Sequence, residues 1–321
     1  VRPAGKPAQP DRGPMIIGID IGGTTSKLGL VQDGRVIAHS RIPTTGHADE
    51  HAFADTLAKA CRDLVAAQPP TSNVQHPTSI GIGAPNGNQH TGSIDRAPNL
   101  PWKRDVPLAA MMQERMSIPC TLGNDANAAA LGEWRYGAGK GVNDLLVVTL
   151  GTGLGSGFIV DGRLVLGPRG NAGELGHTIV VLDGRTCTCG RKGCLEAYVS
   201  IRGMRQTYCE LADDRTLLER EGVLPIAEAA RNGEDAARQT FLNTARWLSA
   251  GLANAAAITA PSRIVLTGGI ARNGELLLDP LRERFAQVLL YIHEGAIDLV
   301  LGELPEDDAG ILGAAALGEK R

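Results

Sequence analysis

The sequence predicts an α/β protein of two domains. At 321 residues the chain is longer than one hydrophobic core usually serves, so we expect two domains of about 150 residues each. Short β-type runs alternate with amphipathic helical segments. Both halves also open alike, as strand, glycine-rich turn, strand and Asp-Gly hairpin. This recurrence favours an internal duplication, although two independent glycine-rich hairpins would look the same.

The first half begins with a predicted β-meander over residues 15–42, in which Asp33-Gly34 is a favoured hairpin turn. Asn124 can cap the helix that follows the last strand of this half. The predicted elements after the meander are a helix over 48–67, a strand over 78–84, an irregular stretch over 85–104, a helix near 105–116, a strand at 120–122 and an alanine-rich helix ending near Tyr136.

The second half repeats the theme and then becomes mainly helical. Its predicted elements are a strand over 144–150, a glycine-rich turn over 151–157, an Asp-Gly hairpin over 158–166, helices from about 196 to 257, a strand from Arg263 to Thr267, and an alanine-rich helix from about Asp308. Because this last helix could rejoin the first domain, we expect a smaller α/β domain of 15–123 plus 307–321, a larger one of 124–306, and a disordered tail over 1–14.

Charge and composition exclude several classes of partner. The formal net charge is −3 and no Lys/Arg-rich run is present, which argues against a nucleic-acid partner. The first fourteen residues are rich in proline, glycine and charge, unlike a secretion signal. The longest apolar stretches, such as residues 250–260, are too short for a membrane span. We therefore expect a cytoplasmic protein without a membrane partner.

Two glycine-rich turns have the composition of phosphate sites, because small residues let backbone N–H groups surround a polyanion. In the segment DIGGTTSK (20–27), Asp20 could hold Mg²⁺ directly or through water, while a plain glycine hairpin would look the same. No P-loop motif is present, and GTGLGSG (151–157) lies between two predicted strands, which excludes the dinucleotide fingerprint. The candidate ATP-binding residues are Asp20, Gly22, Gly23, Thr24, Thr25, Lys27, Gly151, Thr152, Gly153, Gly268 and Gly269.

Three of the six cysteines crowd into one short segment. With His177 they give the pattern H-x9-C-x-C-x4-C, followed by Glu196. Three thiolates and one imidazole complete a tetrahedral zinc set, and a closed set of four ligands indicates a structural zinc. The alternatives are a reduced cysteine loop or a redox site. The predicted ligands are His177, Cys187, Cys189 and Cys194.

Several segments together resemble the ROK family of sugar kinases and sugar-responsive repressors, from residue 15 to the final helix. They are DIGGTTSK, PNLPW (98–102), NDANAAALGE (124–133), LGTGLGSG, AGELGH (172–177) and CTCGRKGCLE (187–196). The resemblance implies the actin-like, ribonuclease-H-like ATPase fold, with ATP and sugar bound in a cleft between two domains. It also implies a homodimer.

The resemblance further implies the roles of the sugar-binding residues. Asp125 is the catalytic base, and Asn124 meets the same sugar hydroxyl. A helix N-terminus favours a carboxylate, so we expect Asp125 to be ionised and able to accept a proton at neutral pH. One ring nitrogen of His177 would bind zinc while the other contacts the sugar. Glu174, His177 and Glu196 hold the anomeric side of the ring, and Asn86 and Asn99 are further candidates.

The implied function is transfer of the γ-phosphoryl group of ATP to a hexose, and the chain is most similar to glucokinases. It departs from their pattern in having Asn86-Gly87 after Pro85 and in lacking a glycine before Trp102. Alternative substrates are N-acetylmannosamine, N-acetylglucosamine, mannose, fructose and allose. A sugar-responsive repressor would need roughly sixty residues or more ahead of the core for its DNA-binding domain, where about fourteen precede Met15. A non-catalytic sugar binder would be expected to lose Asp125 or a phosphate turn.

Overall fold

The computed structural model describes residues 13–68 and 76–319 and contains two five-stranded mixed sheets. Most of the predicted N-terminal tail lies outside the described residues. The strand orders are β3-β2-β1-β4-β7 and β10-β9-β8-β11-β12. In each sheet three consecutive strands form an antiparallel meander, and the other two continue it in parallel. The α/β class is therefore confirmed. Each half of the chain forms its own five-stranded sheet, and the two sheets have the same arrangement of strands.

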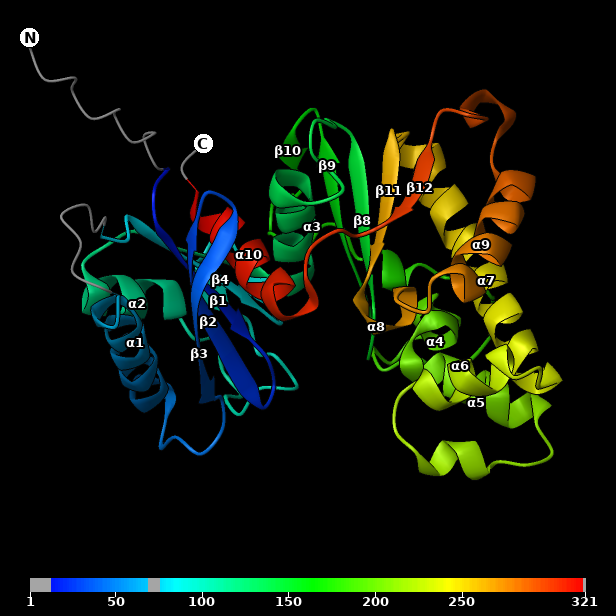
Figure 1. Ribbon diagram of the computed structural model, residues 1–321, viewed down its shortest axis with the longest axis horizontal. Helices are drawn as coiled ribbons and strands as arrows, with labels where there is room; N and C mark the ends of the chain where they lie inside the picture. Colours follow the sequence, from blue (N-terminus) through cyan, green and yellow to red (C-terminus); the bar gives the residue numbers. More distant parts are fainter. Residues whose placement is uncertain (1–12, 69–75, 320–321) are drawn as a thin grey trace, which may run out of the picture.

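The first sheet lies between two helical layers (Figure 1). Alternate residues of its central strand point to opposite faces, so Ile17 and Ile19 pack with α1 and α2, while Ile16 packs with α10. The elements of this half are β1 (Ile16–Ile21), β2 (Thr25–Gln32), β3 (Arg35–Pro43), α1 (Glu50–Ala66), β4 (Ser79–Ala84), β5 (Gly87–Asn88), β6 (Ser93–Ile94), α2 (Leu108–Met116) and β7 (Cys120–Asn124).

The second sheet is buried in the same way. Leu146 and Val148 pack with α7 and α9 on one face, and Leu145 and Val147 pack with α3 on the other. Its elements are α3 (Asp125–Tyr136), β8 (Leu145–Leu150), β9 (Leu154–Val160), β10 (Arg163–Leu164), the 3-10 helix η1 (Leu175–His177), α4 (Glu196–Val199), α5 (Ile201–Leu211), η2 (Thr216–Glu219), α6 (Leu224–Arg231), α7 (Asp235–Thr259), β11 (Arg263–Thr267), α8 (Gly268–Ala271), α9 (Glu275–Val288), η3 (Tyr291–His293) and β12 (Asp298–Leu301).

Two helices, α3 and α10 (Glu306–Gly318), lie between the sheets (Figure 1). Glycines permit this close packing, since a Cβ on Gly132 of α3 would lie 2.9 Å from the Cα of Gly313 in α10. A Cβ on Gly81 of β4 would lie 1.8 Å from the carbonyl oxygen of Ala314. The C-terminal helix thus returns to the first sheet, as the proposed domain division requires; the boundaries themselves stay a prediction.

Two local expectations need correction. The glycine-rich turn is shorter than 151–157, because β9 begins at Leu154. The glycines of β9 serve packing instead: a Cβ on Gly157 would lie 2.4 Å from the Cβ of Ala130 in α3. The stretch predicted as irregular, 85–104, contains the hairpin of β5 and β6.

The hairpin and capping predictions are confirmed. Asp33 and Gly34 have φ values of 51° and 71°, which is the left-handed conformation that a tight two-residue turn requires. Asn124 caps α3 through its side chain. None of the helices in the described ranges combines the length and apolar composition needed to cross a membrane.

Candidate active site

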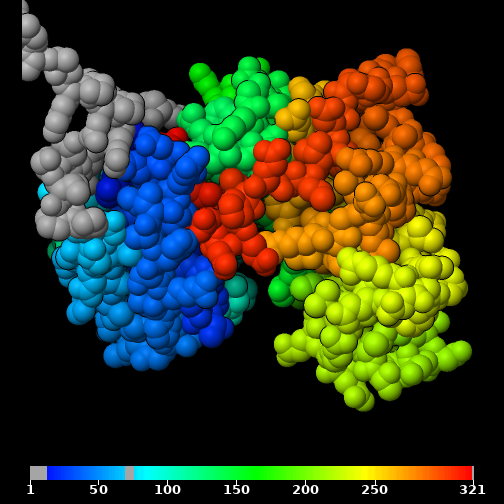
Figure 2. Space-filling model, viewed as in Figure 1, coloured from blue at the N-terminus to red at the C-terminus, as the bar shows by residue number. Residues whose placement is uncertain are grey.

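A cavity of about 770 Å³ lies where the two halves of the molecule face each other. Figure 2 shows a hollow beneath α10, between the blue and the yellow-green parts of the chain. Parallel strands of both sheets end at the cavity, since β4, β7, β8 and β11 lead directly into lining residues, which is the usual ligand position in α/β sheets. The cavity wall includes every predicted sugar-binding residue: Asn86, Asn99, Asn124, Asp125, Glu174, His177 and Glu196.

Asp125 begins α3 at the floor of this cavity. The side chain of Asn124 accepts hydrogen bonds from the backbone N–H groups of Ala126 (2.9 Å) and Asn127 (3.3 Å), which fixes the helix start. Asp125 is exposed to the cavity, but the surrounding protein replaces part of its hydration, and this desolvation raises the pKa of its carboxyl despite the hydrogen bond from Ala126 N–H. Burial, and not the helix N-terminus, is therefore the largest influence on this pKa, and the ionised state of Asp125 at neutral pH stays a prediction.

A second, smaller cavity of about 270 Å³ meets the first at Asp125. Asp20, at the end of β1, lies in its wall, as do Gly268 and Arg272. Burial first, and then the negative charge of Asp125, raise the pKa of Asp20 to about 6, while Lys27 opposes the shift. Two carboxylates that destabilise each other's charge are a donor set that suits a hard divalent cation such as Mg²⁺.

The remaining predicted phosphate contacts are less well placed. Gly22 N–H donates to the carbonyl of Thr25 at 3.1 Å, which closes a tight turn after β1. A Cβ on Gly23 would lie 3.0 Å from the carbonyl oxygen of Asn99, so this turn touches the loop that carries Asn99. Gly151, Thr152, Gly153 and Gly268 line the large cavity, whereas Gly22, Gly23, Thr24, Thr25, Lys27 and Gly269 line neither cavity.

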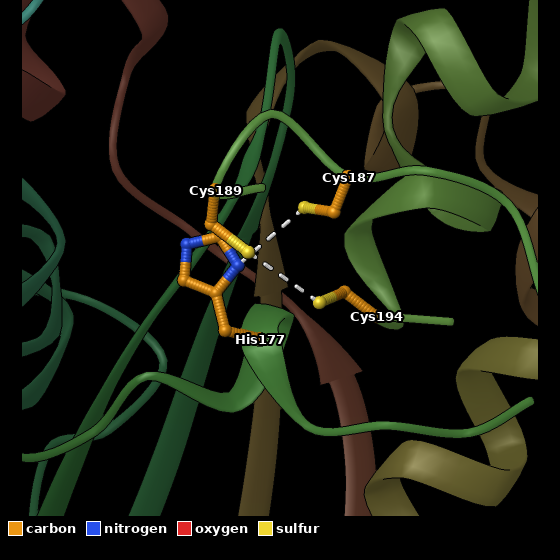
Figure 3. A group of neighbouring side chains, drawn as sticks. All are labelled: His177, Cys187, Cys189 and Cys194. Carbon is orange, nitrogen blue, oxygen red and sulfur yellow. Dashed lines mark hydrogen bonds between the residues drawn. The ribbon is translucent and has the colours of Figure 1, made fainter. Parts of the chain in front are cut away.

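The predicted zinc ligands converge (Figure 3). The candidate ligand atoms of His177, Cys187, Cys189 and Cys194 all lie within 4.8 Å of one another. Cys189 Sγ is 3.6 Å from Cys194 Sγ, and Cys187 Sγ is 3.7 Å from His177 Nδ1. Tetrahedral zinc with Zn–S bonds of about 2.3 Å places sulfurs about 3.8 Å apart. The donor set and its spacing therefore fit zinc.

Glu196 connects this cluster to the glycine turn. Its Oε1 accepts a hydrogen bond from Thr188 Oγ1 at 3.0 Å, and its Oε2 accepts one from Leu154 N–H at 3.1 Å. A Cβ on Gly153 would lie 2.6 Å from Oε2, so a side chain at this position would displace the Glu196 carboxylate. Both carboxylate oxygens are thus already held by protein, which gives Glu196 a structural task that sequence reasoning missed. Since Nδ1 of His177 faces the sulfurs, Nε2 is the ring nitrogen left for a ligand.

The loop of Asn99 is fastened to α1. Trp102 packs against Phe53 of α1 in a tilted arrangement with ring centroids 4.8 Å apart, and Arg104 forms an ion pair with the buried carboxylate of Glu50. Sequence reasoning named no residue between 87 and 98, although that segment forms part of the cavity wall. The polar lining residues that it missed are Asp95, Asn127, Thr149, Ser156 and Asn171.

The raised pKa of Asp20 predicts a pH-dependent cost in stability. Between pH 3.8 and about 6 the folded protein binds more protons at Asp20 than the unfolded chain does, so stability falls as pH rises through this window. Above about pH 6 the full cost is present. We expect Asp20→Asn to stabilise the Mg²⁺-free protein by about 1 to 3 kcal/mol at pH 7.5 and by clearly less at pH 4.5.

Denaturant unfolding at the two pH values measures this difference. Asp63→Asn is the control, because Asp63 forms an exposed ion pair with Lys59 at 2.6 Å on α1. A lower stability of Asp20→Asn at pH 7.5 would show that the ionised carboxylate is favourably paired.

Comparison with known proteins shows the family to which this chain belongs. The sequence pattern of the ROK family matches residues 16–321. The chain belongs to the ROK family. A glucokinase from Streptomyces coelicolor is 33% identical over 322 residues, covering 95% of this chain and 98% of the relative. An N-acetylmannosamine kinase from Shigella flexneri is 32% identical over 313 residues, covering 95% and 99%.

A solved structure shows the same architecture. The crystal structure of a ROK family glucokinase from Streptomyces griseus, in complex with glucose and AMPPNP, is 35% identical to this chain with a TM-score of 0.78. The alignment covers 95% of this chain and 99% of the neighbour. The fold is therefore the actin-like ATPase fold that the resemblance implied.

Proposed function

We propose that this ROK protein is an ATP-dependent hexose kinase that converts glucose to glucose 6-phosphate. The observation that carries the proposal is the position of Asp125, at the junction of a large polar cavity and a smaller one that contains Asp20. The large cavity suits a sugar and, at Gly151 to Gly153, the phosphates, and the smaller cavity suits a cation beside Asp20. The glucokinase relatives and the glucose and AMPPNP complex of the neighbour support the same assignment.

Asp125 is the proposed general base. Its carboxylate accepts the proton of the sugar hydroxyl as that oxygen attacks the γ-phosphorus of ATP, and ADP leaves. The raised pKa of Asp125 makes it a better proton acceptor than an exposed aspartate, because a more basic carboxylate binds the proton more strongly. Asn124 keeps the start of α3 in place and lies beside the reacting hydroxyl.

The other residues hold the two substrates. Glu174, His177 and Glu196 are the proposed contacts of the anomeric side of the sugar, with Asn86 and Asn99 on the opposite wall. Backbone N–H groups of the glycine turns would bind the phosphates. Asp20 would hold Mg²⁺, which neutralises phosphate charge when bound. The candidate ATP-binding residues are those predicted from the sequence. Four of them, Gly151, Thr152, Gly153 and Gly268, line the large cavity.

Zinc is the proposed occupant of the cluster of His177 and the three cysteines. Because His177 belongs both to the cluster and to the cavity wall, the metal would set the orientation of a sugar contact. The proposed domain division is 15–123 plus 307–321 and 124–306, and the proposed assembly is a homodimer in the cytoplasm. Light scattering tests the homodimer.

An ADP-coupled assay over a panel of hexoses tests the proposed function. We expect the highest kcat/KM with glucose, and lower values with mannose, fructose, allose, N-acetylglucosamine and N-acetylmannosamine, because contacts within the cavity discriminate between sugars in the transition state. A higher kcat/KM with N-acetylmannosamine would reassign the substrate. If no sugar stimulates ADP release and the protein instead retards DNA in a gel shift, the repressor alternative would replace the kinase.

A further inference from the structure

We propose that Asp95 is a sugar-contacting carboxylate of this chain and that Asn88 positions it. Asp95 follows β6 and lies in the wall of the large cavity, together with Asn99 and Asn124. It belongs to none of the motifs that identified the family. The inference deepens the proposed function and rests on it in one respect, that the cavity takes a sugar.

The Asp95 carboxylate has one oxygen fixed and one free. Asn88 Nδ2 donates a hydrogen bond to Asp95 Oδ2 at 2.9 Å. Among the residues that the structure describes, none donates a hydrogen bond to Oδ1, and Asp95 is partly exposed in the cavity. A carboxylate held in one orientation with a free acceptor oxygen suits a sugar hydroxyl, since hydrogen bonds to ionised groups are the stronger kind.

Backbone contacts fix the position of Asp95 as well. Asn86 Nδ2 donates to the carbonyl oxygen of Asp95 at 3.0 Å, and Asp95 N–H donates to the carbonyl oxygen of Asn86 at 3.0 Å. Asn86 adopts a positive φ of 51°, which brings its side chain over the hairpin. Asn86 therefore supports Asp95, and Oδ1 and the second hydrogen of Nδ2 remain for a ligand.

Asn88 connects Asp95 to the other half of the molecule. Its side chain is 7% exposed, and Nδ2 also donates to the carbonyl oxygen of Arg169 at 3.0 Å. His90 makes a parallel contact, with Nε2 lying 2.8 Å from the carbonyl oxygen of Gly167. The segment 167–170 follows β10 of the second sheet and leads to Glu174. Asn88 thus joins Asp95 and the β5–β6 hairpin to this segment.

The acidic charge of the cavity wall limits the class of substrate. The wall of the cavity contains Asp95, Glu174, Glu196 and Asp125, all of them acidic. Such a wall accepts hydrogen bonds from the hydroxyls of neutral sugars and disfavours sugars that carry a carboxylate on the ring, such as uronic acids. The ligand class is therefore a neutral sugar with a free hydroxyl facing Asp95.

Equilibrium binding of glucose and its monodeoxy analogues, measured by calorimetry without ATP, tests the proposal. In Asp95→Asn the new amide oxygen can still accept from Asn88, but the free acceptor becomes a donor. We expect the Kd for glucose to rise about tenfold or more. The ratio of variant to wild-type Kd falls toward one for the deoxy sugar that lacks the contacted hydroxyl. Asp105→Asn is the matched control, because Asp105 lies ten residues further on in an exposed ion pair with Arg96.

A double-mutant cycle tests the positioning role of Asn88. We expect Asn88→Ala to raise the Kd for glucose by a clearly larger factor in the wild-type background than in Asp95→Ala, where only its bond to Arg169 remains to be lost. His90→Ala removes the parallel contact to Gly167 but touches no atom of Asp95, so its effect is the same in both backgrounds. Full additivity of Asn88→Ala and Asp95→Ala would overturn the positioning role.

The contact itself fails if Asp95→Asn binds glucose as the wild type does, if its penalty is equal for every deoxy sugar, or if the wild type binds no sugar of the panel. The proposed kinase function fails separately, if the wild type binds glucose but releases no ADP in its presence.

Discussion

Asp125→Asn should lower kcat for hexose phosphorylation by about two to four powers of ten, because general-base catalysis contributes a factor of this size. The asparagine keeps the shape of the side chain and can still accept the hydrogen bond from Ala126 N–H. The loss therefore reports proton acceptance and not collapse of the helix start. Initial rates in the ADP-coupled assay measure it, with glucose KM and the folded content recorded alongside.

The surface variant Asp63→Asn is the control for this substitution as well. The pH profile gives an independent check. Since burial raises the pKa of Asp125, the wild-type rate should fall on the acid side at a pH above the ordinary aspartate range. Asp125→Asn should lose that dependence. Wild-type turnover in the variant would exclude Asp125 as the base.

Removal of zinc should weaken sugar binding about ten- to a hundredfold before the fold is lost. His177 Nδ1 faces the sulfurs and His177 also lines the cavity, so an empty metal site would free the ring that we propose as a sugar contact. Glu196 would be released too, because Thr188 of the same loop donates a hydrogen bond to one of its oxygens. ATP affinity should change less.

Glucose binding by calorimetry on chelated protein measures the effect of zinc removal, with the metal content verified by mass spectrometry and near-UV circular dichroism reporting the fold. Cys194→Ser should behave like the chelated protein. Cys209→Ser is the matched control, since Cys209 lies on α5 outside the cluster. Unchanged glucose affinity in verified zinc-free protein would contradict the coupling.

The sequence allowed good predictions where the signal is local. The Asp-Gly hairpins, the Asn124 cap and the convergence of His177 with the cysteines depend on residues close in the chain, whose chemistry restricts the backbone directly. The order of elements followed from apolar periodicity for the same reason. The motifs that contain Asn124 and the cysteines also carry the resemblance to the family, and that resemblance implied the sugar-binding residues of the cavity wall.

Long-range geometry set the limits of prediction. The Glu196 contact to Leu154 spans 42 residues, and the Asn88 contact to Arg169 spans 81, so neither could be read from spacing. The glycines of β9 resemble a phosphate turn in sequence. The helix α3, whose close packing requires them, cannot be inferred from the sequence of the strand alone. For Asp125, the local helix N-terminus was clear, but the desolvation that outweighs it comes from the folded environment.

A crystal structure of the protein with glucose and a non-hydrolysable ATP analogue tests the central claim most directly. We predict that the 6-hydroxyl of glucose lies about 2.6 to 3.2 Å from a carboxylate oxygen of Asp125, with the γ-phosphate on the side of Asp20. A sugar bound with another hydroxyl at Asp125, or with Asp125 out of hydrogen-bonding reach, would contradict the account.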